Sequence, residues 1–192
     1  MDYSEQIKAY IRREKELLDS LDISQINAIL NELLAAHARQ GRIYIFGNGG
    51  SAATASHFAN DFNKGISEYV ENKFRFTCLN DNVATVLAIA NDIGYEHIFS
   101  FQLDGILEEK DLVIAISGSG NSANVIKAVE YAKAQGVPTI AVTGYDGGKL
   151  AKICDLTFLA PVHNMQLVED AHMILDHLLM TVVCQIWGIA TH

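Results

Sequence analysis

The chain has 192 residues, of which about half are hydrophobic and about a fifth are charged, which suits one domain with a buried core. Its formal net charge of −9 argues against direct binding to nucleic acid, because such proteins carry a basic patch. No apolar stretch approaches the roughly 20 residues that span a bilayer, and the charged start is not a signal peptide. We therefore expect a cytoplasmic protein with no membrane partner. Its cysteines should be reduced in that compartment.

Two helices are predicted ahead of the first strand. Apolar residues recur at helical spacing over 4–19 and 24–40, with a junction near 22–24. These helices precede any strand that they could cover, so we expect that they pack on each other and on a second subunit. The predicted organisation is an N-terminal helical hairpin over 1–40 that makes an oligomer contact, followed by an α/β domain over 41–192, in a single structural unit.

From residue 42 onward, short apolar strands alternate with helices. The predicted strands cover 42–47, 75–80, 111–117, 139–144 and 156–161, and the predicted helices cover 51–64, 82–92, 95–107, 123–136 and 165–187. This alternation is typical of a parallel sheet covered on both faces. We therefore predict an α/β fold, a doubly wound five-stranded parallel sheet of the flavodoxin type. Ligands of such folds bind beyond the C-terminal ends of the strands, which selects the glycine-rich loops 47–51, 117–122 and 143–148.

The loop 117–122 (SGSGNS) lies between a predicted strand and a predicted helix. Its glycines permit close backbone approach, and the helix start offers unpaired N–H groups and a positive dipole end. Ser117, Ser119 and Ser122 add hydroxyl donors. Neither a Walker loop nor a strict GxGxxG is present, which disfavours a nucleotide. A plain capped turn is the alternative, but GNGGS at 47–51 repeats the same chemistry, so we interpret the two loops as a site for a phosphate monoester.

A metal site is a second hypothesis. His57 and Asp61 are four residues apart on one predicted helix, so both project from one face. Glu169 and His177 are eight apart on the last helix and differ by about 80° around it, so both can reach one site. Two imidazoles and two carboxylates suit zinc or a similar divalent ion, although such short spacings also arise by chance.

Five motifs, taken in order, resemble the SIS-domain phosphoheptose isomerases, and together they cover nearly the whole chain. The motifs are FGNGGSAATASHFANDF (46–62), IANDIGYEHIF (89–99), ISGSGNSANVIKA (116–128), TGYDGGKLAKICD (143–155) and VEDAHMILDH (168–177). The resemblance implies that 41–192 is a SIS domain and that the protein is a homotetramer with one zinc ion per subunit. It also implies an aldose–ketose isomerase that converts sedoheptulose 7-phosphate to D-glycero-D-manno-heptose 7-phosphate.

The resemblance also implies roles for individual residues. Metal ligands would be His57, Asp61, Glu169 and His177, and the catalytic groups would be Asp61, Glu169, His177 and Asp92. Substrate-binding residues would be Asn48, Gly49, Gly50, Ser51, Asn91, Asp92, Ser117, Gly118, Ser119, Ser122 and Glu169, with the serines of 117–122 on the phosphate.

This sequence departs from the usual pattern of that family at several of these positions. Asp61 stands where the family usually has Glu, Glu169 where it has Gln, and Gly118 where it has Thr. Gln166 and Leu167 replace a usual Asp and Arg. The second carboxylate lowers the formal charge of an occupied zinc site from +1 to 0, and a less positive metal polarises a carbonyl less. We therefore hypothesise that Glu169 shares the role of general base while Asp61 only binds the metal.

Two other functions stay open at this point. A SIS tetramer can act without catalysis, as a phosphosugar sensor or as a protein-binding scaffold of the type that binds a replication initiator. An isomerase of another ketose phosphate is equally compatible with the motifs, because the shape of the pocket selects the sugar. The two histidines and two acids at the metal positions favour an enzyme over a scaffold.

Overall fold

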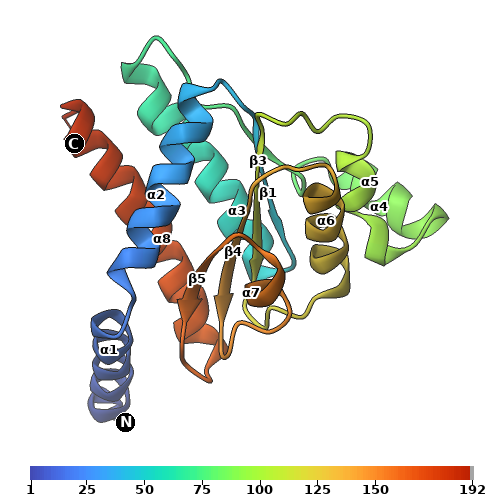
Figure 1. Ribbon diagram of the computed structural model, residues 1–192. Helices are drawn as coiled ribbons and strands as arrows, with labels where there is room; N and C mark the ends of the chain where they lie inside the picture. The colour runs from blue at the N-terminus through green and yellow to red at the C-terminus, as the bar shows by residue number, and fades with distance from the viewer. Residues whose placement is uncertain (191–192) are drawn as a thin grey trace.

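A five-stranded parallel sheet forms the centre of the structure, a computed structural model that describes residues 1–190 (Figure 1). The strands are β1 (Ile43–Gly47), β2 (Phe76–Cys78), β3 (Leu112–Ser117), β4 (Thr139–Gly144) and β5 (Leu156–Ala160). Their order in the sheet is β2-β1-β3-β4-β5, and every neighbouring pair is parallel. The predicted five-stranded parallel sheet is thereby confirmed. Successive strands are added on one side of β1 and then, from β3 onward, on the other side, so the strand order reverses between β1 and β3. Ligands of such folds bind at this point.

Helices cover both faces of the sheet, because successive strand residues point to opposite sides. Ile43 and Ile45 face one core, whereas Tyr44 and Phe46 face the other. The first core is closed by α2 (Ile23–Ala38), α3 (Gly50–Asn60) and α8 (Met165–Trp187). The second core is closed by α4 (Val83–Asp92), α5 (Ser100–Leu103), α6 (Ala123–Ala134) and α7 (Leu150–Ile153). None of the helices in residues 1–190 is long and apolar enough to cross a membrane.

The two leading helices differ from the expectation of a hairpin. Helix α2 buries Ile29 and Leu33 in the same core as β1 and β3, so it covers the sheet instead of standing apart from it. Helix α1 (Ser4–Asp19) extends beyond the start of α2 and does not fold back along it (Figure 1). It touches α8 instead, where the Tyr10 hydroxyl donates a hydrogen bond to Asp170. The physical reason is that the outer face of a parallel sheet must be covered, and α2 carries the apolar stripe that does so.

Several helix boundaries also differ from the predicted ones. The predicted helix over 51–64 is α-helical only to Asn60 and continues as a π-helix, η1 (Asp61–Ile66), and then a 3-10 turn, η2 (Ser67–Tyr69). The predicted helix over 95–107 is a 3-10 turn, η3 (Tyr95–His97), followed by the short α5. Helix α7 was not predicted. π-Helical segments within α-helices occur frequently at functional sites, and η1 begins at Asp61.

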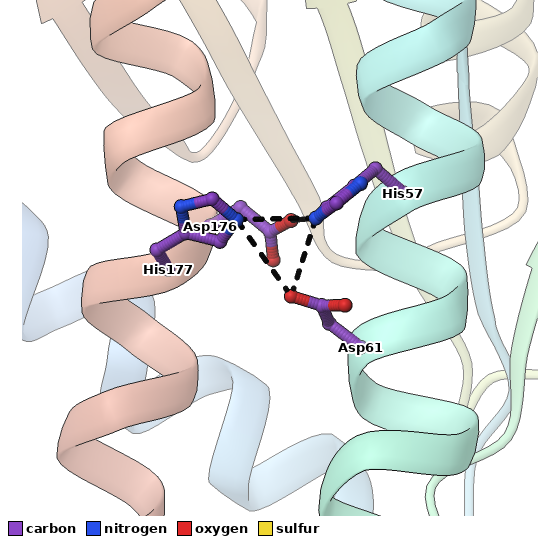
Figure 2. Close-up of side chains that lie close together, drawn as sticks. All are labelled: His57, Asp61, Asp176 and His177. Atoms are coloured by element: carbon purple, nitrogen blue, oxygen red, sulfur yellow. Dashed lines mark hydrogen bonds and ion pairs between the residues drawn. The ribbon is translucent and has the colours of Figure 1, made fainter. Parts of the chain in front are cut away.

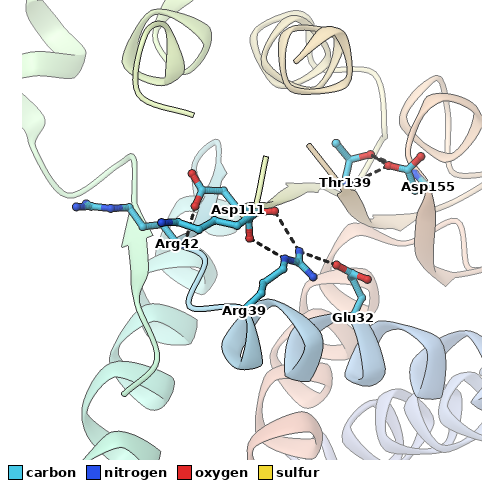
Figure 3. Close-up of polar contacts among 7 residues, drawn as sticks. Glu32, Arg39, Arg42, Asp111, Thr139 and Asp155 are labelled. Atoms are coloured by element: carbon cyan, nitrogen blue, oxygen red, sulfur yellow. Dashed lines mark hydrogen bonds and ion pairs between the residues drawn. The ribbon is translucent and has the colours of Figure 1, made fainter. Parts of the chain in front are cut away.

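Polar contacts hold the N-terminal ends of the strands together (Figure 3). The Asp111 carboxylate accepts a hydrogen bond from the backbone N–H of Arg42, and the Arg39 guanidinium donates to the carbonyl of Asp111. Asp155 accepts from both the backbone N–H and the hydroxyl of Thr139. These side chains therefore satisfy backbone groups at the N-terminal ends of the strands, which are the ends opposite to the glycine-rich loops.

One buried histidine ties α8 to the C-terminal end of β4. His172 is almost fully buried, and its Nε2 lies 3.0 Å from the carbonyl oxygen of Thr143, to which it donates. Burial lowers the pKa of His172 to about 4, against a smaller raising effect of that hydrogen bond. The ring therefore stays neutral in the folded protein at pH values where it is protonated in the unfolded chain.

We expect this histidine to make stability depend on pH. Its folded pKa is depressed, so its contribution is complete above about pH 6.5 and is lost as the pH falls towards 4. The free energy of unfolding of the wild type, minus that of His172→Gln, should fall by about 2 kcal/mol between pH 7 and pH 5. Urea denaturation at both pH values measures this difference. The exposed His163, changed to Gln, serves as the control, and a pH-independent difference for His172→Gln would contradict the prediction.

Candidate functional site

A small cavity lies at the C-terminal ends of β1 and β3, where the strand order reverses. Its volume is about 130 Å³, which matches a phosphate group better than a whole sugar. Most of its wall comes from residues that the sequence had suggested for substrate. The lining residues are Asn48, Ser51, Ile116, Ser117, Gly118, Ser119, Ser122, Met165 and Glu169. The structure therefore brings the two glycine-rich loops to one place, as the sequence led us to expect.

The loop 117–122 is shaped by close backbone contact with the loop that follows β4. Gly120 has a φ of +64°, and a Cβ at this position would lie 2.0 Å from the carbonyl oxygen of Gly147. The backbone N–H of Gly144 donates to the carbonyl of Gly118 at 2.9 Å. Only glycine at 120 allows the two loops to pack in this way. The second loop therefore acts as a support for the first.

Neutral hydrogen-bond donors surround this cavity. The hydroxyls of Ser117 and Ser122 lie 3.1 Å apart, and helix α6 begins directly after Ser122 without a side-chain cap. Among the first N–H groups of α6, that of Val125 donates to Asn124 Oδ1, whereas those of Ala123 and Asn124 have no carbonyl of the helix within reach. Unpaired N–H groups at the positive end of a helix dipole form an anion site. The arrangement suits a phosphate that binds and leaves without a fixed positive charge.

Asn48 is held at the mouth of the cavity by residues that sequence reasoning missed. Its side-chain amide exchanges two hydrogen bonds of 2.9 Å with the amide of Asn124, and the Tyr95 hydroxyl donates to its oxygen. A polar residue in the first turn of the helix after the Ser/Gly loop was the available signal for Asn124. Asn91 and Asp92 were predicted here, but they are exposed at the end of α4, bonded to each other, and absent from the cavity wall.

Glu169 lies on the cavity wall above the start of α3. A Cβ at Gly50 would lie 2.6 Å from the Glu169 carboxylate oxygen Oε1, so the glycine makes room for the carboxylate. The position is close to the first residues of α3, where the helix dipole favours a negative charge. Gly50 and Glu169, which were both predicted to bind the substrate, are therefore brought together, one from each helix.

Four other side chains form a compact group farther along the same two helices (Figure 2). His57 and Asp61 come from α3 and the start of η1, whereas Asp176 and His177 are neighbours on α8. The Nε2 atoms of the two histidines lie 3.1 Å apart, and Asp61 Oδ2 lies 3.5 Å from His57 Nε2. The predicted residues His57, Asp61 and His177 are thus close together, and Glu169 lies outside this group.

Asp176 is the member of the group that the sequence reading did not single out. Its side chain is fully buried, and neither carboxylate oxygen has a hydrogen-bond partner within residues 1–190. Burial, and then the nearby Asp61 carboxylate, raises the pKa of Asp176 to about 8. The available signal was an acidic residue within the apolar stripe of the last helix. A buried carboxylate without a partner is costly, so the chemistry of this position suits a cation.

The donor set fits a divalent metal ion. Each of the four residues offers one ligand atom, and these atoms all lie within 4.8 Å of one another. Two ligand atoms at 2.0–2.1 Å from a tetrahedral zinc ion lie roughly 3.3 Å apart. The separations of 3.1 Å and 3.5 Å are close to this value, and Asp176 Oδ2 and Asp61 Oδ2 each lie 4.0 Å from one imidazole nitrogen of the group. Imidazole nitrogens and carboxylate oxygens are both common zinc ligands.

Comparisons with known proteins show which family this chain is similar to. The model of the SIS domain family matches residues 2–144. A phosphoheptose isomerase from Aneurinibacillus thermoaerophilus is 33% identical over 184 residues, which cover 92% of this chain and 91% of that protein. A solved phosphoheptose isomerase from Neisseria gonorrhoeae is 30% identical, with a TM-score of 0.87 over 96% of this chain and 100% of that one. Another from Francisella tularensis has a TM-score of 0.88 at 26% identity, with the same coverage of 96% and 100%.

Zinc should stabilise the folded protein through the group of four. At about 100 times its dissociation constant, a ligand that binds only the folded state adds about 2.7 kcal/mol to the free energy of unfolding. For a chain of this size that raises Tm by roughly 5–10 °C. Thermal unfolding of metal-stripped protein with and without zinc measures the shift. His57→Ala should abolish it, and His163→Ala, which changes an exposed histidine outside the group, should not. An unchanged Tm in the wild type would refute the site.

Proposed function

We propose that this chain, which belongs to the SIS-domain phosphoheptose isomerase family, converts sedoheptulose 7-phosphate to D-glycero-D-manno-heptose 7-phosphate. It is an aldose–ketose isomerase, as are its relatives of that name. The observation that carries the substrate proposal is the placement of Glu169. Its carboxylate lies on the wall of a phosphate-sized cavity. Glu169 is also on α8, the helix that carries two members of the group of four.

The phosphate would occupy the cavity between Ser117 and Ser122. No lysine or arginine is among the residues that line the cavity in the described chain, so the dianion is held by hydroxyls, backbone N–H groups and the dipole of α6. A cavity of about 130 Å³ holds little more than the phosphate. The sugar would therefore extend along the seam between α3 and α8, past Glu169 and towards His57. Anchoring the remote end in this way orients the reacting carbons.

Isomerisation needs a base for a carbon-bound proton and groups that exchange protons with the sugar oxygens. Glu169 would remove a proton from C1 of the ketose, which leaves an enediol with a double bond between C1 and C2. The same carboxyl group would then return the proton to C2, and the aldehyde forms at C1 as its hydroxyl proton leaves. Of the two groups predicted to exchange the oxygen protons, His177 would do so, because it is exposed on α8, whereas Asp92 is not among the residues that line the cavity.

A divalent metal ion belongs to the same proposal, and its supporting observation is the unpartnered Asp176 carboxylate beside two imidazoles. His57, Asp61 and His177 would hold the ion, one per subunit. When bound, zinc would act as a Lewis acid towards the sugar oxygens. Asp61 is one methylene shorter than the glutamate usual in the family, which favours a ligand role over that of a mobile base.

A homotetramer in the cytoplasm completes the proposal. Helix α1 supports the subunit contact, because Tyr3, Ile7 and Ile11 are about half exposed along it. Apolar side chains gathered on one exposed helix are typical of a surface that another chain covers. The proposed tetramer would therefore bury the stripe that α1 leaves open in the single chain.

Direct assay tests the substrate. Sedoheptulose 7-phosphate incubated with zinc-loaded protein should yield the aldose, and one solvent hydrogen should appear on the product when the reaction is run in D₂O, as followed by NMR. Ketose phosphates with five or six carbons are the comparison substrates, and they should turn over more slowly. Faster turnover of one of them would reassign the sugar. No turnover of any ketose phosphate would favour a sensor or scaffold.

Glu169→Gln tests the base. The amide keeps the shape of the side chain but cannot accept the proton, so kcat should fall by roughly 100-fold to 10,000-fold while KM changes little. Steady-state kinetics on sedoheptulose 7-phosphate measures both. Glu130→Gln is the matched control, because Glu130 is exposed and paired with Lys149 on the far side of the sheet. Wild-type kcat in Glu169→Gln would transfer the role of base to another residue.

A further inference from the structure

We propose that Asp176 is a direct ligand of the metal ion, so that the ligand set of this chain is His57, Asp61, Asp176 and His177. This inference rests on the metal part of the proposed function and is independent of the identity of the sugar. It assigns to Asp176 the fourth position for which the family pattern suggested Glu169.

The burial of Asp176 is the first reason. The residue lies on the inner face of α8, fully buried, with both carboxylate oxygens unpartnered within residues 1–190. The one basic side chain that the described structure places within 4.0 Å is His57, which itself belongs to the group. A buried carboxylate is tolerated when it is paired or binds a metal. The position therefore has the chemistry of a metal ligand.

The placement of the four side chains is the second reason. Asp176 and His177 are consecutive on α8 and so point about 100° apart around the helix. Asp176 approaches the common point from the core, and His177 approaches it from the solvent side (Figure 2). His57 and Asp61 close the group from the facing helix, with Asp176 Oδ2 4.0 Å from His57 Nε2. An ion at this point would be contacted from both helices and from both the buried and the exposed side.

The location of Glu169 is the third reason. Helices α3 and α8 contact each other with Gly50 beside Glu169 at one end and His57 beside Asp176 at the other. Seven residues separate the two contacts on each helix, which corresponds to roughly 10 Å along the axis. Glu169 therefore sits with the phosphate cavity, and Asp176 sits with the histidines. A carboxylate ligand at Asp176 leaves Glu169 free to act on the sugar.

Zinc affinity of the purified full-length chain tests the assignment. Metal-stripped wild type, Asp176→Asn and Asp176→Leu would each compete for zinc with a chromophoric chelator at pH 7.5. Zinc affinity should fall at least roughly tenfold in both variants. Loss of a residue that only hydrogen-bonds to a metal ligand already costs about this much, and loss of a ligand should cost no less. Glu169→Gln is the matched control, since it removes one negative charge from the same helix, and it should bind zinc like the wild type. Far-UV circular dichroism confirms that each variant is folded.

Cobalt gives a second readout that does not depend on activity. The visible absorption of Co²⁺ bound to the wild type reports the ligand set, and Asp176→Asn should shift its bands whereas Glu169→Gln should not. The inference would be overturned if folded Asp176→Asn kept the zinc affinity and the cobalt spectrum of the wild type. If zinc affinity fell and the cobalt bands shifted in Glu169→Gln alone, the fourth ligand position would return to Glu169. Tight zinc binding that depends on Asp176 in a protein without isomerase activity would instead leave this inference standing and overturn the proposed substrate.

Discussion

The contact between α3 and α8 is the constraint on which the rest of the site depends. The two helices cover the same face of the sheet, and each contributes one residue of the Gly50–Glu169 contact and two residues of the metal group. Their register is set by α8 packing on β4, where a Cβ at Gly144 would lie 2.4 Å from Val168. His172 fixes the same register through the Thr143 carbonyl. A shift of α8 by one residue would therefore separate both pairs of functional groups at once.

The proposed phosphate cavity depends on a different constraint, the packing of one glycine-rich loop on another. The backbone of Gly120 approaches that of Gly147 so closely that a side chain is excluded. This support leaves the hydroxyls and the start of α6 as the groups that face the cavity. Met165 then covers the position of Gly118, where a Cβ would lie 2.7 Å from its sulfur. The missing side chain at 118 is thus matched by a bulky one on α8, which compensates in volume for the hydroxyl that the loop lacks.

The proposed zinc site contains more than one acidic side chain, and a third acid lies close to it. Two carboxylates and two imidazoles give an occupied zinc site a formal charge of zero, and the Glu169 carboxylate lies nearby at the cavity. The proposed division places charge neutralisation with Asp61 and Asp176 and proton transfer with Glu169. Each acid then has an environment that suits its role: Asp176 is fully buried next to the histidines, whereas Glu169 is partly exposed beside the start of α3.

The amino-acid sequence by itself determined the fold class and the position of the two glycine-rich loops, because both follow from local patterns. Short continuous apolar runs and apolar residues with period 3.6 predict which segments form strands and helices, and the parallel order brings 47–51 and 117–122 to one edge. Tertiary structure alone decided that α2 covers the sheet, that Asn124 holds Asn48, and that Asp176 joins the histidines. Spacing along one helix shows which residues share a face, but the partner across the contact is set by how two helices pack. Asp176 and Glu169 are both acids on α8, and only the register against α3 places one beside His57 and the other beside Gly50.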